Sequence, residues 1–253
     1  MEWHPSTPLK GNRPFGVKLP ANSGQEIEYQ KIRYPGYFAG DDVILVDCPM
    51  SSFHKLRQMN IEHLTESRNI RIIIILVTHT HGDHVSGIAT LIQFAYYVWH
   101  VPVVVAAPNA EVKEDLRYLI RRLEGCDDIA YHLTTADRLK LWVKDVIPTS
   151  HAPGLAGRCF GYHLSVDDQK VIYTGDTNTL KPYMPYISEG STLYVEVASK
   201  KSPVHLYLPD ILDDLIGLTE KNIDVYLMHL DNEDAINEMI AGTRIKLAPL
   251  YSE

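Results

Sequence analysis

Four side chains that can bind a metal ion lie within six residues of one another: His79, His81, Asp83 and His84. They directly follow the branched-aliphatic run 72–76, which predicts a buried strand. Imidazole and carboxylate groups are ligands for Zn²⁺, and also for Mn²⁺ or Fe²⁺. Gly82 supplies the backbone freedom that a tight strand-to-helix corner needs. The stretch therefore predicts a metal site at the end of a strand.

Three further residues of ligand type each follow an apolar run that predicts a strand: His151, Asp176 and His229. Open α/β sheets bind ligands beyond the strand ends, so these side chains are expected near the first group. Taken singly, each has an ordinary explanation, such as a hydrogen-bonded histidine or an aspartate that caps a turn. Together the seven residues are enough for two four-coordinate metals, if one carboxylate bridges and water completes the site.

The composition is that of a soluble globular protein. The chain has 253 residues, of which 45% are hydrophobic and 22% charged, and its formal net charge is −8. Binding to a long nucleic acid requires a basic surface, so this charge argues against such a partner. The most apolar window, 88–107, is interrupted by His100 and Pro102, so no membrane span is expected.

The cysteines and the start of the chain favour the cytoplasm. Cys48, Cys126 and Cys159 are scattered and odd in number, which is typical of reduced thiols in a reducing compartment. Residues 1–14 are polar and contain proline, with no charged-then-apolar pattern of a secretory signal. We therefore expect a cytoplasmic protein.

The rest of the chain alternates predicted strands with predicted helices, and no linker divides it. One domain is expected over residues 1–253, with residues 1–27 as an extended arm of little regular structure. Strands are predicted at 43–46, 71–77, 101–106, 160–165, 170–173, 192–197, 224–227 and 244–247, with two short strands in 27–39 and two or three in 129–148. Helices are predicted at 51–64, opened by Ser51 and Ser52, and at 85–99, 109–123, 179–187, 208–219 and 232–240. This alternation favours a layered α/β sandwich.

The seven residues resemble the signature of the metallo-β-lactamase superfamily of hydrolases. That signature runs His-x-His-x-Asp-His, then a separate His, an Asp after a strand and a late His. The resemblance extends from about residue 43 to residue 229. It implies a four-layer αββα sandwich of the α/β class, with the metals at one edge of the two sheets.

The resemblance also implies which residues hold which metal: His79, His81 and His151 hold one, Asp83, His84 and His229 hold the other, and Asp176 bridges them. Asp47 resembles an early aspartate that supports the site. Two divalent ions about 3.5–4 Å apart, Zn²⁺ in first place, would share a water and make it a bridging hydroxide, the nucleophile. Redox relatives place Glu at the second position of the first motif, so His81 favours hydrolysis.

Glu196 and His205, between Asp176 and His229, indicate which bond is hydrolysed. They resemble a pair in the phosphodiesterase branch of the superfamily, which includes the tRNA-processing nuclease RNase Z. There, an acidic strand residue and a following His are thought to protonate the leaving alkoxide. The resemblance makes Asp83, Glu196 and His205 the candidate catalytic residues. A Glu at a strand end and a His at a helix entry are also ordinary structural features.

The sequence departs from RNase Z in its middle. Only a predicted hairpin separates His151 from Asp176, where RNase Z has a long arm that grips tRNA. With the acidic net charge, this favours a small phosphodiester such as a cyclic nucleotide as substrate. Ala-Pro-Gly follows His151, whereas Ser is common in the branch. Compact phosphodiesterases of the family often dimerise, so a homodimer is expected, with arm 1–27 lying across the partner.

Two alternatives remain open on the same residues. An acyl hydrolase, either a lactonase or a thioesterase resembling glyoxalase II, would share all seven ligands. Glyoxalase II usually adds a C-terminal helical domain, and here only a short predicted helix and strand follow His229. A non-catalytic metal-binding regulatory protein is the other alternative, and the intact ligand set counts against it.

Overall fold

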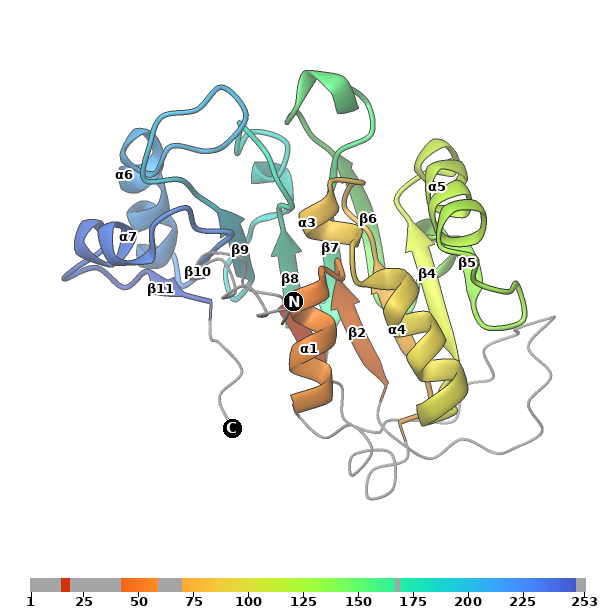
Figure 1. The fold of residues 1–253 in the computed structure, drawn as a ribbon. Coiled ribbons are helices and arrows are strands. Elements are labelled where there is room, and N and C mark those ends of the chain that lie inside the picture. The colour runs from red at the N-terminus through yellow and green to blue at the C-terminus, as the bar shows by residue number, and fades with distance from the viewer. Residues whose placement is uncertain (1–14, 19–41, 59–69, 167–168, 249–253) are drawn as a thin grey trace.

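Two β-sheets form the centre of the protein (Figure 1). The computed structural model describes residues 15–18, 42–58, 70–166 and 169–248. Within these residues, one sheet has the strand order β1-β2-β3-β4-β5 and the other the order β11-β10-β9-β8-β7-β6. The predicted strands in 27–39 and the predicted end of the first helix at 59–64 lie outside the described residues.

Parallel strands dominate the first sheet. Its strands are β1 (Phe15–Lys18), β2 (Val43–Val46), β3 (Ile73–Leu76), β4 (Val103–Ala107) and β5 (His132–Thr135). The strands from β2 to β5 are parallel, so their carboxyl ends meet at one edge, whereas β1 pairs antiparallel with β2. Residues 1–27 were expected to form an extended arm of little regular structure, and their described part, 15–18, forms the strand β1 along the edge of β2.

The second sheet combines an antiparallel half with a parallel half. Its strands are β6 (Val143–Pro148), β7 (Phe160–Val166), β8 (Gln169–Tyr173), β9 (Thr192–Glu196), β10 (Asp224–Met228) and β11 (Lys246–Leu247). The predicted hairpin is present as the antiparallel pair β7–β8. The strands from β8 to β11 are parallel, so β8, β9 and β10 also end at one edge.

Helices cover the outer faces of both sheets (Figure 1). The helices α1 (Met50–Gln58), α4 (Ile88–Phe94) and α5 (Ala110–Arg117) lie on the side of the first sheet, and α6 (Leu208–Glu220) and α7 (Glu233–Met239) on the side of the second. Both α4 and α5 continue as π-helical turns, at Ala95–Trp99 and Tyr118–Leu123. The short helix α3 (Gly82–Val85) lies between β3 and α4. This arrangement confirms the predicted αββα sandwich.

Two helix predictions needed correction. The predicted helix 179–187 is a series of turns with one 3₁₀ turn, Met184–Tyr186. Pro182 and Pro185 lack the amide hydrogens that a continuous helix needs there. The first helix begins at Met50, so Ser51 and Ser52 lie inside it and do not cap it. The Met50 amide donates to the Ser86 hydroxyl instead, at 3.1 Å.

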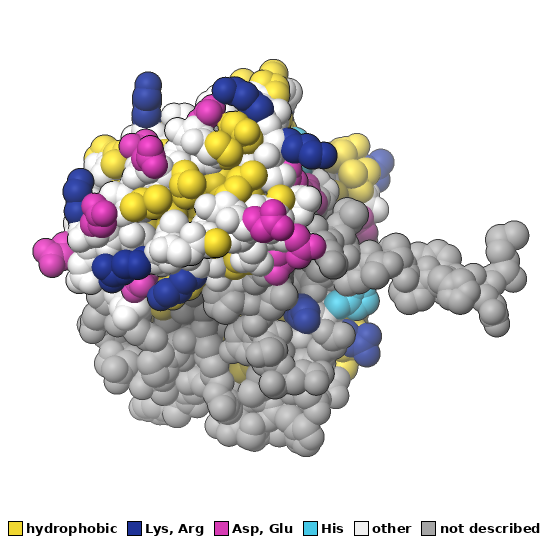
Figure 2. Space-filling model, turned by 90° about the vertical axis from the view of Figure 1, so that its left-hand side faces the viewer, with side chains coloured by type: hydrophobic (Ala, Val, Ile, Leu, Met, Phe, Trp, Pro, Cys, Tyr) yellow, Lys and Arg dark blue, Asp and Glu magenta, His cyan; other side chains and the backbone are white. Residues whose placement is uncertain are grey.

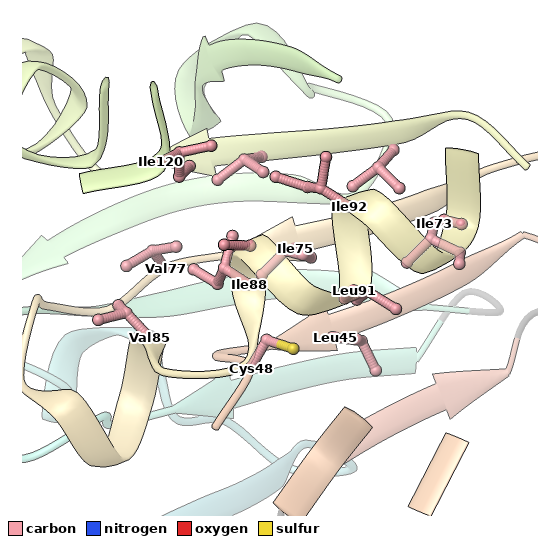
Figure 3. Close-up of a cluster of buried hydrophobic side chains, with 14 of the residues drawn as sticks. Leu45, Cys48, Ile73, Ile75, Val77, Val85, Ile88, Leu91, Ile92 and Ile120 are labelled. Atoms are coloured by element: carbon pink, nitrogen blue, oxygen red, sulfur yellow. The ribbon is translucent and has the colours of Figure 1, made fainter. Parts of the chain in front are cut away.

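The central strand β3 is buried on both faces, which explains its unbroken aliphatic sequence. Its alternate side chains point to opposite sides. Ile73 and Ile75 pack with α4, as Figure 3 shows, whereas Ile74 and Leu76 belong to the core between the sheets. A third core joins the second sheet to α6 and α7. Burial of each such side chain contributes about 1.5–3 kcal/mol, so β3 is a rigid base for the residues that follow it.

The surface over α6 and α7 mixes charges of both signs with apolar side chains (Figure 2). Lysines and arginines alternate there with aspartates and glutamates. This agrees with an acidic chain that has basic residues spread among acidic ones. Within the described residues, no helix is both long enough and apolar enough to cross a membrane.

Candidate metal centre

The loops after four strands bring all seven predicted ligands to one edge of the sandwich. The first four follow β3, and the others follow β6, β8 and β10. Asp47 follows β2 and points at the same group. Three turns use left-handed backbone: Asp47 has φ 62°, Gly175 has φ 58° and His229 has φ 53°. Aspartate and histidine tolerate this conformation better than most residues other than glycine.

The first group of ligand atoms comes from His79, His81, His151 and Asp176. His79 Nε2 lies 3.0 Å from His81 Nδ1, and His151 Nε2 lies 3.3 Å from the same atom. The carboxylate oxygen Asp176 Oδ2 lies 3.9 Å from His79 Nε2 and 3.6 Å from His151 Nε2. Three imidazoles and one carboxylate therefore converge from three loops.

The second group comes from Asp83, His84 and His229, again beside Asp176. Asp176 Oδ2 lies 3.4 Å from His84 Nε2 and 3.5 Å from His229 Nε2. Asp83 Oδ2 lies 3.7 Å from His84 Nε2 and 3.4 Å from His229 Nε2. Asp176 Oδ2 therefore faces both groups, which is the position of a bridging ligand.

Both groups fit divalent cations. Ligand atoms about 2.0–2.1 Å from a tetrahedral Zn²⁺ lie about 3.3 Å from one another, close to most of the separations above. His84 Nε2 is one of two buried side-chain polar atoms among the described residues that have no hydrogen-bond partner. A buried nitrogen without a partner costs free energy that a bound cation would recover. Imidazole and carboxylate donors suit Zn²⁺, Mn²⁺ or Fe²⁺.

A buried carboxylate orients one histidine of each group. Asp47 Oδ2 accepts hydrogen bonds from His84 Nδ1, at 2.7 Å, and from the Thr78 hydroxyl, at 2.7 Å. Because that hydroxyl donates to Asp47, its oxygen accepts from His79 Nδ1, at 3.0 Å. Both histidines thus donate through Nδ1 and turn Nε2, the nitrogen that would bind a metal, toward the cluster. Sequence reasoning found Asp47 but not Thr78, since a threonine at a strand end carries no metal signal.

The pKa values of the first group favour neutral imidazoles. Burial, with a smaller effect of His84, lowers the pKa of His79 to about 2. Burial likewise lowers the pKa of His81, and it is also the main cause of a lowered pKa at His151. Neutral imidazole is the form with a free lone pair. These side chains are therefore ready to bind a cation without first losing a proton.

The second group carries an excess of negative charge. Burial lowers the pKa of His84, but the carboxylates of Asp47 and Asp176 outweigh burial and raise it well above the usual value. At His229, burial is outweighed in the same way by Asp176 and Asp83. Burial raises the pKa of Asp176 itself, but His84 and His229 outweigh it and lower that pKa. The site thus favours positive charge, which protons or metal ions would supply.

Glu196 and His205 lie beside the ligand cluster. Glu196 is fully buried, and its two carboxylate oxygens lie 3.1 and 3.2 Å from His205 Nδ1. The same carboxylate accepts the Thr177 amide, at 2.8 Å, next to Asp176. A ring nitrogen of His205 lies within 4.8 Å of ligand atoms of Asp176 and His229. The structure therefore brings all nine sequence-predicted site residues together.

The fold and this cluster are those of a metal-dependent hydrolase. The sequence matches the family described as "Beta-lactamase superfamily domain" over residues 43–230. The chain therefore belongs to the metallo-β-lactamase superfamily of hydrolases. No curated protein sequence matches it.

Solved structures share the fold at low sequence identity. A diphosphatase of the PhnP family is 16% identical with a TM-score of 0.57, over 93% of this chain and 95% of that one. The metallo-β-lactamase fold protein YhfI from Bacillus subtilis is 13% identical with a TM-score of 0.60, over 94% of this chain and 98% of that one. A long form of RNase Z from yeast is 12% identical with a TM-score of 0.54, over 90% of this chain and 38% of that one.

Replacement of one first-group ligand tests the division into two groups. We expect His81→Ala to lose about one metal ion per chain and at least about 100-fold in turnover, because each ion needs its full set of ligands. Metal analysis of the purified protein, with turnover on the same sample, measures both. His54→Ala, at an exposed position on α1, is the matched control and should change neither. Normal metal content in His81→Ala would remove His81 from the ligand set.

Proposed function

We propose that this protein is a binuclear metal-dependent phosphodiesterase that acts on a small phosphodiester such as a cyclic nucleotide. The observation that carries the proposal is the buried Glu196 carboxylate bound to His205 at the edge of the ligand cluster. Hydrolysis of a phosphodiester expels an alkoxide, and a basic alkoxide needs a proton. The names of two fold relatives, a diphosphatase and RNase Z, also favour phosphoryl chemistry.

The proposed mechanism gives the metal ligands, Glu196 and His205 different roles. When bound, two divalent cations would supply an activated water as nucleophile and draw charge from a phosphoryl oxygen. Glu196 engages His205 Nδ1 and leaves Nε2 as the nitrogen available to a substrate. A proton on Nε2 passes to the leaving oxygen as the P–O bond breaks. Asp83, the most exposed carboxylate of the cluster, faces the solvent side and completes the second group.

The proposed acid has a specific kinetic signature. His205→Ala should keep both metals and lower turnover about 100-fold on diesters with basic alkoxide leaving groups. On p-nitrophenyl diesters the loss should be below about threefold, because a good leaving group needs little protonation. A series of diesters of graded leaving-group pKa measures the difference.

His163→Ala is the matched control for this variant. His163 also pairs with a carboxylate, that of Asp145 at 2.7 Å, but outside the ligand cluster, so the variant should retain normal rates throughout the series. Equal slowing of good and poor leaving groups by His205→Ala would make His205 a structural residue and would remove the main support for the proposal.

A comparison of substrates tests the reaction class directly. The metal-loaded protein would be assayed on bis(p-nitrophenyl) phosphate, a simple lactone and a glutathione thioester. Phosphodiester turnover well above the other two would support the proposal, and cyclic mononucleotides would then be screened. Turnover of the lactone or thioester with little diester cleavage would instead identify an acyl hydrolase on the same ligands.

The choice of Zn²⁺, a homodimer and a cytoplasmic site of action are further parts of the proposal. The candidate ligands are five imidazoles and two carboxylates, one of which would bridge the two ions. This donor set favours Zn²⁺ first. Sedimentation of the metal-loaded protein would decide between monomer and dimer, and elemental analysis after expression in unsupplemented medium would identify the metal.

A further inference from the structure

His205 belongs to a loop that is closed at its base. The Ala198 amide donates to the Leu206 carbonyl, at 2.7 Å, and the Leu208 amide donates to the Ala198 carbonyl, at 3.0 Å. The chain therefore leaves the end of β9 and returns to it within residues 199–207, which we call the His205 loop. Because His205 lies on neither a strand nor a helix, the hydrogen bonds of this loop decide where its imidazole lies.

We call the loops that carry the candidate metal ligands the ligand loops. Two of them form hydrogen bonds to the part of the His205 loop that directly precedes His205. After β6, His151 Nδ1 donates to the Val204 carbonyl, at 2.8 Å. After β8, Asn178 Nδ2 donates to the Pro203 carbonyl, at 3.0 Å. A carbonyl oxygen only accepts, so both nitrogens are donors here. The two carbonyls that directly precede His205 are thus fixed by a candidate metal ligand and by a residue two positions after Asp176.

A third ligand loop forms hydrogen bonds to the start of the His205 loop, at Ser199. After β10, Asp231 Oδ1 accepts the Ser199 amide, at 2.7 Å, and Asp231 Oδ2 accepts the Ser199 hydroxyl, at 3.0 Å. Asp231 lies two positions after His229. Each ligand loop of the second sheet therefore sends one side chain to the His205 loop, and Glu196 holds the imidazole itself.

We propose that Asn178 and Asp231 are positioning residues that set where His205 lies relative to the ligand cluster. This inference rests on the proposed function, in which His205 donates a proton to the leaving group. A proton donor must come within about 2.6–3.2 Å of the leaving oxygen. A displacement of about 1 Å at a reacting group costs up to about 100-fold in rate. Loss of one contact should therefore act on the step that His205 serves.

The test uses the metal-loaded variants Asn178→Ala and Asp231→Ala with the series of leaving groups. We expect about tenfold lower kcat on poor leaving groups, less than about twofold on p-nitrophenyl diesters, and normal metal content. Asp231→Asn keeps an acceptor for the Ser199 amide, so its loss should lie between those of wild type and Asp231→Ala. Asn237→Ala on α7 and Asp214→Ala on α6, both at exposed positions, are the matched controls.

Double variants show whether the effect passes through His205. Combined with His205→Ala, neither Asn178→Ala nor Asp231→Ala should slow poor substrates further, because the group that they position is gone. Multiplied losses would overturn the proposal. Hydrogen exchange gives a readout without turnover: amides of residues 199–207 should exchange faster in both variants than in the controls. Unchanged exchange would also overturn it.

Failure of this inference is distinguishable from failure of the proposed function. Equal slowing of all substrates by His205→Ala would overturn the proposed acid, and this inference with it. A leaving-group effect in His205→Ala, together with wild-type kinetics in Asn178→Ala and Asp231→Ala, would overturn this inference alone.

Discussion

Asp176→Ala should leave less than about one metal ion per chain and lower turnover by about 10⁴-fold or more. Asp176 Oδ2 lies 3.4–3.9 Å from imidazole nitrogens of both groups, at His79, His151, His84 and His229. Each of the other candidate ligands is assigned to one group, so only this replacement is expected to remove a ligand from both. His81→Ala, by contrast, should lose about one ion.

Isothermal titration calorimetry with the divalent metal ion measures how many metal sites the variant has lost. The Asp176→Asn variant keeps the shape but removes the charge, so it separates the need for an anionic ligand from the need for an oxygen. Asp224→Ala removes an exposed carboxylate on β10 and is the matched control, expected to retain two ions and full turnover. Two tightly bound ions in Asp176→Ala would contradict a bridge at this position.

Asp47→Asn should lower the free energy of unfolding of the metal-free protein by about 2–4 kcal/mol, or about 5–10 °C in Tm. The Asp47 carboxylate accepts the Thr78 amide, the Thr78 hydroxyl and His84 Nδ1, all at 2.7 Å. An amide in its place offers one acceptor oxygen and turns an NH₂ group toward a donor. Asparagine is the informative replacement, because it tolerates the left-handed backbone of this position, which alanine would strain.

The same variant should also weaken metal binding about 10–100-fold, since His84 and, through Thr78, His79 lose their orienting partner. Thermal unfolding with and without chelator separates the two effects. Asp145→Asn removes one charge from the half-exposed pair with His163 and should cost less than about 1 kcal/mol. If Asp47→Asn matched that small loss, the Asp47 network would have no orienting role.

The sequence predicted those parts of the fold in which local pattern and burial agree. The unbroken run of β3 and the His-rich loop after it carried enough signal to place the metal cluster and the family. The strand β1 was not predicted because its four residues pair with β2 through backbone hydrogen bonds. Such bonds leave no pattern of side-chain types in the sequence. The prediction of a helix at 179–187 was wrong because the apolar residues there lie in turns around Pro182 and Pro185. Tyr183, between the two prolines, is fully buried.

The candidate site was predictable to the extent that its residues carry metal chemistry. All seven ligand-type residues were predicted from their types and order along the chain, and the pair Glu196–His205 from the family resemblance, and the structure places these residues together. Thr78, Asn178 and Asp231 were not, because a hydroxyl, an amide and a lone carboxylate have many ordinary uses. The roles proposed for them rest on distances between loops from different strands, such as 2.7 Å from Asp231 to Ser199, which spacing along the chain does not encode.

The left-handed backbone at Asp47 and His229 limits how this protein can evolve. At each position one residue meets two separate demands, a φ above +50° and a side chain directed at the ligand cluster. Glycine would satisfy the first demand alone, and glutamate or glutamine the second at best, with added strain. A saturation library should therefore accept almost no substitution at these two sites. A change of metal preference is more accessible at ligands with ordinary backbone, such as His151.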